Sequence, residues 1–160
     1  MPDGPLAWLG ATALSQAMRE NAWLYPIVEI VHIVGFAVLV GSVVLFDLRV
    51  LGFARTLPVA ALGRHLLRWA LASLLLVVPA GLLLFSAHPD ELAGNPAFQL
   101  KLVLIAAAGL NAFAFHVFPY RSVGSWEREL AAPGAARVQA LVSILLWIGV
   151  ISCGRLLAYL

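Results

Sequence analysis

The chain has 160 residues, of which 62% are hydrophobic and 11% are charged, and its formal net charge is +2 at pH 7. Soluble domains average about 45–50% apolar and about 25% charged residues, so this composition excludes a water-soluble fold. The length leaves room for one domain, 1–160, and the basic residues lie at helix ends instead of forming one stripe, which argues against a nucleic-acid partner. We therefore expect an all-α integral membrane protein, an up-down four-helix bundle whose partner is the lipid bilayer.

The apolar segments predict the elements in chain order. Residues 6–18 are too short to span a bilayer, and we expect them to form a helix that lies in the membrane interface. Four longer segments follow, each near the ~20 residues that a membrane-spanning helix needs. Pro26 starts the first, Pro79 is expected to bend the second, and Pro119 stops the third. The predicted spans are about 24–48, 66–87, 98–118 and 136–159.

Basic residues are unevenly distributed over the connections between these spans. The connections from span one to span two and from span three to span four carry seven of the ten, namely Arg49, Arg55, Arg64, Arg68, Arg121, Arg128 and Arg137. By the positive-inside rule these two connections face the cytoplasm. Both termini are then expected on the outer, periplasmic side of a bacterial inner membrane.

Several ionisable residues lie inside the predicted spans, where a charge costs about 2.5–3.5 kcal/mol at the helix centre. Glu29, His32, Lys101 and Arg155 share one level in the outer half of an up-down bundle. One interpretation is an ion pair between Glu29 and Arg155 or Lys101 that holds the spans together. The other is a small-ligand or proton site around His32. A di-iron site is not favoured, because the spans supply no second Glu-x-x-His.

His65 and His116 share the opposite, inner level. Two neutral imidazoles can ligate one haem iron axially, and Arg64 and Arg68 lie near enough to the surface to pair with haem propionates. The alternative is that His65 is an interfacial residue and that His116 hydrogen-bonds Asn111 or a backbone carbonyl. His32 lies about 15 Å away in depth and is not expected to share a metal with His116.

Three further features of the spans bear on these interpretations. The pair Asp47 and Arg49, at the inner end of span one, is interpreted as an anchor. Cys153 is the single cysteine, so the sequence has neither a disulfide framework nor a covalent haem-attachment motif. Small residues on spans three and four favour a homodimer.

The strings YPIVEIVHIVGFAVLVG, DLRVLG, NPAFQLKLVLIAAAGLNAFAFH and LLWIGVISCGRLLAYL resemble an uncharacterised bacterial family of small four-span inner-membrane proteins over nearly the whole chain. More distantly, the layout is similar to the membrane domain of copper resistance D proteins and to cytochrome b561-type electron carriers. That second likeness implies haem b as a cofactor and quinol or a redox protein as a partner. Span four has no histidine, so at most one bis-histidine haem is expected.

Two functions remain as candidates from the sequence. The first is a b-type haem-binding electron carrier that uses His116 and His65. The alternative is a non-redox protein that binds or transports a small ligand, a proton or an ion through Glu29, His32, Lys101 and Arg155, with Asn111 as a further polar residue of the interior. Nothing in the sequence decides whether the protein is an enzyme.

Overall fold

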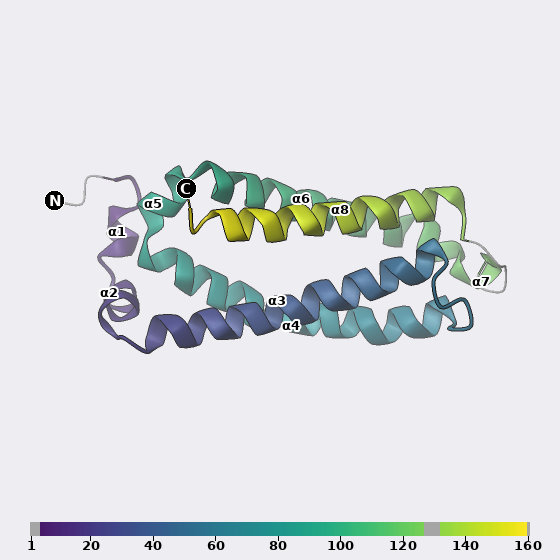
Figure 1. Ribbon diagram of the computed structural model, residues 1–160, viewed down its shortest axis with the longest axis horizontal. Helices are drawn as coiled ribbons and strands as arrows, with labels where there is room; N and C mark the ends of the chain where they lie inside the picture. The colour runs from purple at the N-terminus through teal and green to yellow at the C-terminus, as the bar shows by residue number, and fades with distance from the viewer. Residues whose placement is uncertain (1–3, 127–131, 160) are drawn as a thin grey trace.

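The computed structural model describes residues 4–126 and 132–159. All the secondary structure in this part of the chain is helical. Four long helices run alternately up and down: α3 (Leu24–Leu51), α4 (Val59–Ala87), α6 (Pro96–Val117) and α8 (Gly134–Leu156) (Figure 1). Each is long and apolar enough to cross a membrane, and the third apolar stretch extends to Arg121. The expected all-α architecture with four membrane-spanning helices is confirmed.

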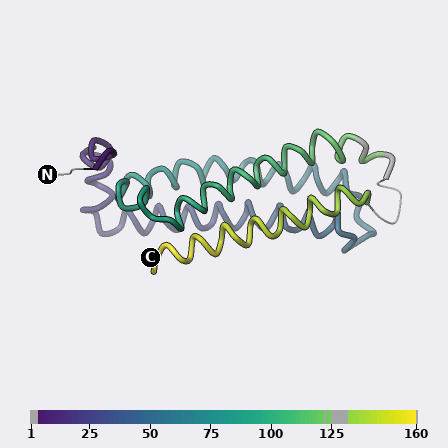
Figure 2. Tube along the Cα trace, turned by 90° about the horizontal axis from the view of Figure 1, so that it is seen from above, coloured from purple at the N-terminus to yellow at the C-terminus, as the bar shows by residue number. Residues whose placement is uncertain are grey.

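Short helices cover the two ends of the bundle. At the end that holds both chain termini, here called the termini end, lie α1 (Ala7–Gly10), α2 (Ala13–Glu20) and α5 (Pro89–Gly94). At the opposite end, the connection end, lie η1 (Pro119–Ser122) and α7 (Val123–Trp126). Figure 2 shows the same long bundle from above, with α1 and α2 folded across the termini end.

The single interfacial helix expected over residues 6–18 is in fact two helices. Thr12 separates them, because its hydroxyl donates to the Leu9 carbonyl at 2.9 Å and accepts from the Ser15 amide at 3.2 Å. One side chain thus ends α1 and caps α2, as Thr does at helix N-termini.

Helix α4 begins seven residues earlier than the expected start near residue 66, directly after Pro58. A hydropathy pattern does not predict this first part of the helix, because several of its residues are polar. Arg64, His65 and Arg68 are exposed, whereas Val59 and Gly63 are buried against the bundle. The segment is therefore an amphipathic extension of the span.

The interior faces of the helices follow the spacing of a coiled-coil seam. The buried residues of α8 recur at spacings of three, four or seven positions: Ala136, Ala140, Ser143, Val150 and Cys153. On α6 the buried residues Ala97, Ala108 and Phe115 keep the same register. Lys101 and Asn111 fall on this stripe of α6, so the helix turns two polar side chains towards its neighbours.

Two apolar clusters hold the bundle together. At the connection end, Phe46, Val50, Val59, Phe115, Ala136 and Ala140 pack as one core. At the termini end, Met18, Val28, Ala80 and Ala87 form the second. Helix α3 packs against α4 and α8, and α8 also packs against α6. The lipid-facing sides carry exposed side chains such as Leu75 and Leu110.

The small residues of α6 do not all serve close packing inside the chain. Ala108 is buried, but Ala106 is exposed and a Cβ on Gly109 would meet no atom within 4 Å. On α8, by contrast, Gly149 receives the side chain of Leu104, which a Cβ there would approach to 3.0 Å. The close contact between α6 and α8 therefore depends on Gly149.

Candidate functional site

His32 projects from α3 onto α4. Its Nδ1 atom lies 3.0 Å from the carbonyl oxygen of Val77. Because a carbonyl oxygen only accepts, Nδ1 carries the proton, and in the neutral ring Nε2 is left as a hydrogen-bond acceptor. Gly81, one turn further along α4, makes room for the ring, since a Cβ there would lie 3.0 Å from the His32 Cε1 atom.

Aromatic rings continue from His32 across the interior. The imidazole stacks on Phe36 of α3 with 6.4 Å between ring centroids. Phe36 in turn meets the edge of Trp147 of α8 at 5.9 Å. These contacts connect three helices, α3, α4 and α8, around one histidine and give the site an apolar aromatic wall.

Lys101 reaches the interior from the fourth helix, α6. The register of α6 is fixed at its start by Asn95, whose side-chain oxygen accepts from the amides of Ala97 at 2.9 Å and Phe98 at 3.3 Å. The Lys101 Nζ atom lies 3.8 Å from the position that a Cβ on Gly154 of α8 would take. The charged groups of Lys101 and Glu29 both lie within electrostatic range of the His32 ring. Lys101 and His32 therefore belong to one interior region near the termini end.

The ammonium group of Lys101 is unpartnered. Within residues 4–126 and 132–159 it makes no hydrogen bond and no ion pair. An ammonium ion is strongly hydrated in water, and moving it into a bundle within a bilayer requires a compensating partner. A lone interior lysine is therefore the strongest chemical signal among the expected site residues.

The expected ion pair between Glu29 and Arg155 is wrong. Both side chains are exposed, and Arg155 donates to the hydroxyl of Tyr159, over whose ring its guanidinium also lies at 4.7 Å. The reason is the rotation of the helices. Glu29 of α3 and Arg155 of α8 both lie on outward faces of their helices, so neither side chain enters the space between them.

Asn111 does not join the region around His32. Its amide nitrogen donates to the backbone carbonyl of Gln139 on α8 at 3.0 Å. This bond connects α6 to α8 nearer the connection end and leaves Asn111 in a structural role.

Asp47 and Arg49, which the sequence suggested as one anchor, face different ways. Arg49 donates to the carbonyls of Leu57 at 2.6 Å and Arg55 at 3.2 Å and so closes the connection between α3 and α4. Asp47 points into the bundle, where the hydroxyl of Ser143 on α8 hydrogen-bonds its carboxyl group. Sequence reasoning missed this inward carboxyl. The sequence indicates the inward position of Asp47 only through its neighbour Phe46, a large apolar residue that is buried on α3.

His65 and His116 are not brought face to face. Gly63 of α4 faces inward, since a Cβ there would lie 2.9 Å from the Tyr120 hydroxyl. His65 follows two residues later, about 200° further around the helix, and is exposed with Arg64 and Arg68. His116 is also exposed, and its Nδ1 lies 2.8 Å from the Ala112 carbonyl of its own helix. These positions do not fit one haem iron between the two rings.

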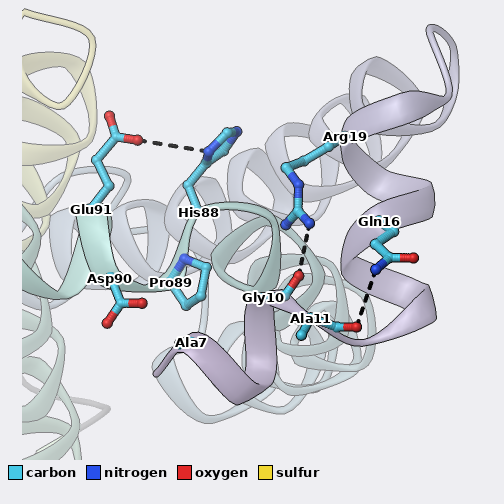
Figure 3. A pocket seen from close by; sticks show the side chains of 9 residues that line it. All are labelled: Ala7, Gly10, Ala11, Gln16, Arg19, His88, Pro89, Asp90 and Glu91. Carbon is cyan, nitrogen blue, oxygen red and sulfur yellow. Dashed lines mark hydrogen bonds and ion pairs between the residues drawn. The ribbon is translucent and has the colours of Figure 1, made fainter. Parts of the chain in front are cut away.

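A surface pocket of about 480 Å³ opens at the termini end (Figure 3). It is lined by Ala7, Gly10, Ala11, Gln16, Arg19, His88, Pro89, Asp90 and Glu91. Arg19 donates to the carbonyls of Ala87 at 2.9 Å and Gly10 at 2.8 Å, and Asp90 accepts from the Leu6 amide at 3.0 Å. These bonds attach α1 and α2 to the bundle, so the charged groups of the pocket are largely engaged in holding this end together.

Comparison with known proteins identifies the family of the chain. The model of a family of unknown function, DUF6644, matches residues 8–160, and the chain belongs to this family. No curated protein and no solved structure matches it. The expected resemblance to an uncharacterised family is thereby confirmed, and the more distant likeness to copper resistance D and cytochrome b561 proteins stays a prediction.

Proposed function

We propose that this member of DUF6644 is a non-redox protein of the bacterial inner membrane that binds a small carboxylate anion in its interior, between His32 and Lys101. The observation that carries the proposal is the partnerless ammonium group of Lys101 on the interior stripe of α6. A half-buried cation needs an anion or an acceptor beside it, and none of the described side chains forms a hydrogen bond or an ion pair with Lys101. Glu29, the acid at this level, is exposed.

The surroundings of Lys101 indicate the kind of anion. One ammonium balances one negative charge, which favours a monocarboxylate. Phe36, Trp147 and Leu104 present apolar surface in the same part of the bundle and suit a short apolar body. The His32 Nε2 atom accepts a hydrogen bond when the ring is neutral and donates one when it is charged. It can therefore receive a ligand hydroxyl or donate to a carboxylate oxygen.

The orientation that we propose puts this site on the periplasmic side. The two connections rich in arginine lie at the connection end of the bundle, and both termini lie at the other end. The positive-inside rule then assigns the connection end to the cytoplasm. Lys101, six residues into α6 from its start at Pro96, lies nearer the periplasmic surface.

A thermal-melting screen of the protein in detergent tests the proposal. The probes are the sodium salts of acetate, propionate, butyrate and lactate, with sodium chloride at equal ionic strength as the reference. A ligand at 100 times its Kd stabilises the folded state by about 2.7 kcal/mol. We expect at least one monocarboxylate to raise the melting temperature of the wild type and not of Lys101→Met.

Arg155→Gln is the matched control for this screen, because Arg155 is a basic residue at a similar level whose side chain is exposed. It should keep the full response to the carboxylate. No response in the wild type, or an equal response in Lys101→Met, would contradict the proposal.

A b-type haem held by His116 and His65, with electron transfer to quinol or a redox protein, is the other function that the sequence predicts. The exposed positions of both histidines give it no support. It stays a separate prediction with its own test, the visible spectrum of protein purified after expression with ample haem. A Soret band that His116→Ala removes and His32→Ala leaves unchanged would establish it in place of the anion site.

A further inference from the structure

A second polar cluster lies inside the bundle towards the connection end and is made by Asp47, Ser143, Gln139 and Asn111. Asp47 is only 5% exposed and Ser143 only 8%. In the part of the chain that the structure describes, two buried side-chain atoms have no hydrogen-bond partner: Oδ2 of Asp47 and Oε1 of Gln139. Buried polar atoms rarely lack a hydrogen-bond partner in proteins, and each one that does requires an explanation.

The two orphaned oxygens belong to one neighbourhood. Ser143, whose hydroxyl hydrogen-bonds the Asp47 carboxyl, follows Gln139 by four residues on α8. Residues at this spacing lie above one another on the same helix face. Asn111 connects the third helix, α6, because its side-chain amide donates to the backbone carbonyl of Gln139 at 3.0 Å. The side chains of α3, α6 and α8 therefore converge here.

Among the residues that the structure describes, no positive charge faces Asp47. The nearest cation along its own helix, Arg49, is bonded to the carbonyls of Leu57 and Arg55. The buried residues of α4 at this level, such as Gly63 and Ala70, are uncharged. The basic residues of the surrounding elements are all exposed: Arg64, His65, Arg68, His116, Arg121 and Arg137. A carboxylate in this position would be a buried charge without compensation.

We propose that Asp47 is a proton-binding site, in which the carboxyl group carries its proton on Oδ2 and donates it to Oε1 of Gln139. Two oxygen acceptors cannot bond to each other, but one proton turns Oδ2 into a donor and satisfies both atoms. The carboxylate takes this proton from water and becomes neutral, which removes the cost of a buried charge. The site is independent of the anion site, since it shares no residue with it.

Infrared spectroscopy of the protein in lipid vesicles detects this proton. A neutral carboxyl group has a C=O stretching band that ionised carboxylates lack. We expect such a band near neutral pH in the wild type, a shift of it in D₂O, and its loss in Asp47→Asn. In Gln139→Leu the band should persist at higher frequency, because the carboxyl keeps its proton and loses its acceptor.

Melting temperature against pH gives an independent readout. Asp47→Asn keeps an oxygen for Ser143 and supplies an N–H group for Gln139, so it mimics the protonated acid. It should match the wild type at low pH. As pH rises through the range in which Asp47 loses its proton, the wild type should lose stability relative to Asp47→Asn, because ionisation leaves a buried charge.

Two results would overturn the proposal. One is the absence of a carboxyl band that Asp47→Asn removes, with Asp47→Asn less stable than the wild type at every pH, which would mean that the fold requires the carboxylate. The other is a melting temperature that rises with sodium concentration in the wild type and not in Asp47→Asn, which would identify the ligand of the carboxyl as a metal cation.

Discussion

The Nδ1 atom of His32 on α3 lies 3.0 Å from the carbonyl oxygen of Val77 on α4. This bond fixes the tautomer of the neutral ring, and it leaves Nε2 as the nitrogen that is free to meet a ligand. It also connects the chemistry of the site to the packing of α3 on α4, since the ring lies close against the backbone of α4 at Gly81.

Gly81→Ala should therefore disturb the site directly. The new Cβ would lie 3.0 Å from Cε1 and 3.4 Å from Nδ1 of His32, closer than the ring tolerates without moving. We expect a loss of about 1–3 kcal/mol in the free energy of unfolding, the usual cost of overpacking, and weaker carboxylate binding. Thermal melting and titration calorimetry measure the two effects.

Gly109→Ala is the matched control for Gly81→Ala, because a Cβ there would meet nothing within 4 Å. It should stabilise the protein by about 0.5–1 kcal/mol, the gain expected inside a helix. Equal effects of the two variants would contradict the placement of His32 against α4.

Lys101→Met should raise the stability of the ligand-free protein. The substitution removes an ammonium without a partner and leaves a side chain of similar length that suits an apolar interior. Insertion scales limit the gain to about 3 kcal/mol, since they assign that cost to a lysine at the helix centre. Denaturant unfolding in anion-free buffer is the measurement. A clear loss of stability would mean that Lys101 has a structural partner.

Asn111→Ala should destabilise the protein without changing carboxylate affinity. The variant removes the bond to the Gln139 carbonyl, and hydrogen bonds between membrane helices contribute about 0.6–2 kcal/mol. Melting temperature and calorimetric affinity, measured on the same preparation, separate the two quantities. A large fall in affinity would return Asn111 to the ligand site.

Arg49→Gln should weaken the connection between α3 and α4. Arg49 donates to two carbonyls of that connection, and hydrogen bonds to charged groups contribute about 1.5–3 kcal/mol each. Arg64→Gln serves as the control, since Arg64 is exposed on α4. Equal melting temperatures for the two variants would be inconsistent with this role of Arg49.

Reporter fusions at Leu160 test the orientation. The uneven distribution of basic residues predicts that the C-terminus is periplasmic. Alkaline phosphatase fused at this position should be active, and green fluorescent protein fused at the same position should not fluoresce. The opposite pattern would place the site of Lys101 on the cytoplasmic side.

Hydropathy predicts the four spans because a bilayer requires long apolar helices, and it selects Lys101 because a charge inside one stands out. It does not predict which way a residue near a helix end points. Glu29 and Arg155 lie at such ends and face outward, whereas Asp47, at the end of α3, faces inward. That difference depends on the rotation of each helix, which is set by side-chain packing between helices distant in sequence.

The sequence also predicts the depth of the histidines along the bundle, but not the direction in which each side chain points. His65 and His116 do lie towards the connection end, but a shared depth does not make two side chains face each other. Gly63 occupies the inward position of α4, where it allows Tyr120 to approach, and His65 is consequently turned outward. The contacts of Gly63 with Tyr120 and Phe46 show this, and they depend on packing between segments distant in sequence.

The most direct test of the anion site is a calorimetric titration of the carboxylate that stabilises the wild type best, into wild type, Lys101→Met and Lys101→Arg. Truncating one partner of a buried charge pair costs about 2–5 kcal/mol. We therefore predict that Lys101→Met loses binding by at least roughly 30-fold, because each 1.4 kcal/mol is tenfold in affinity, and that Lys101→Arg retains part of it. Equal affinities in the wild type and Lys101→Met would contradict an anion site at Lys101.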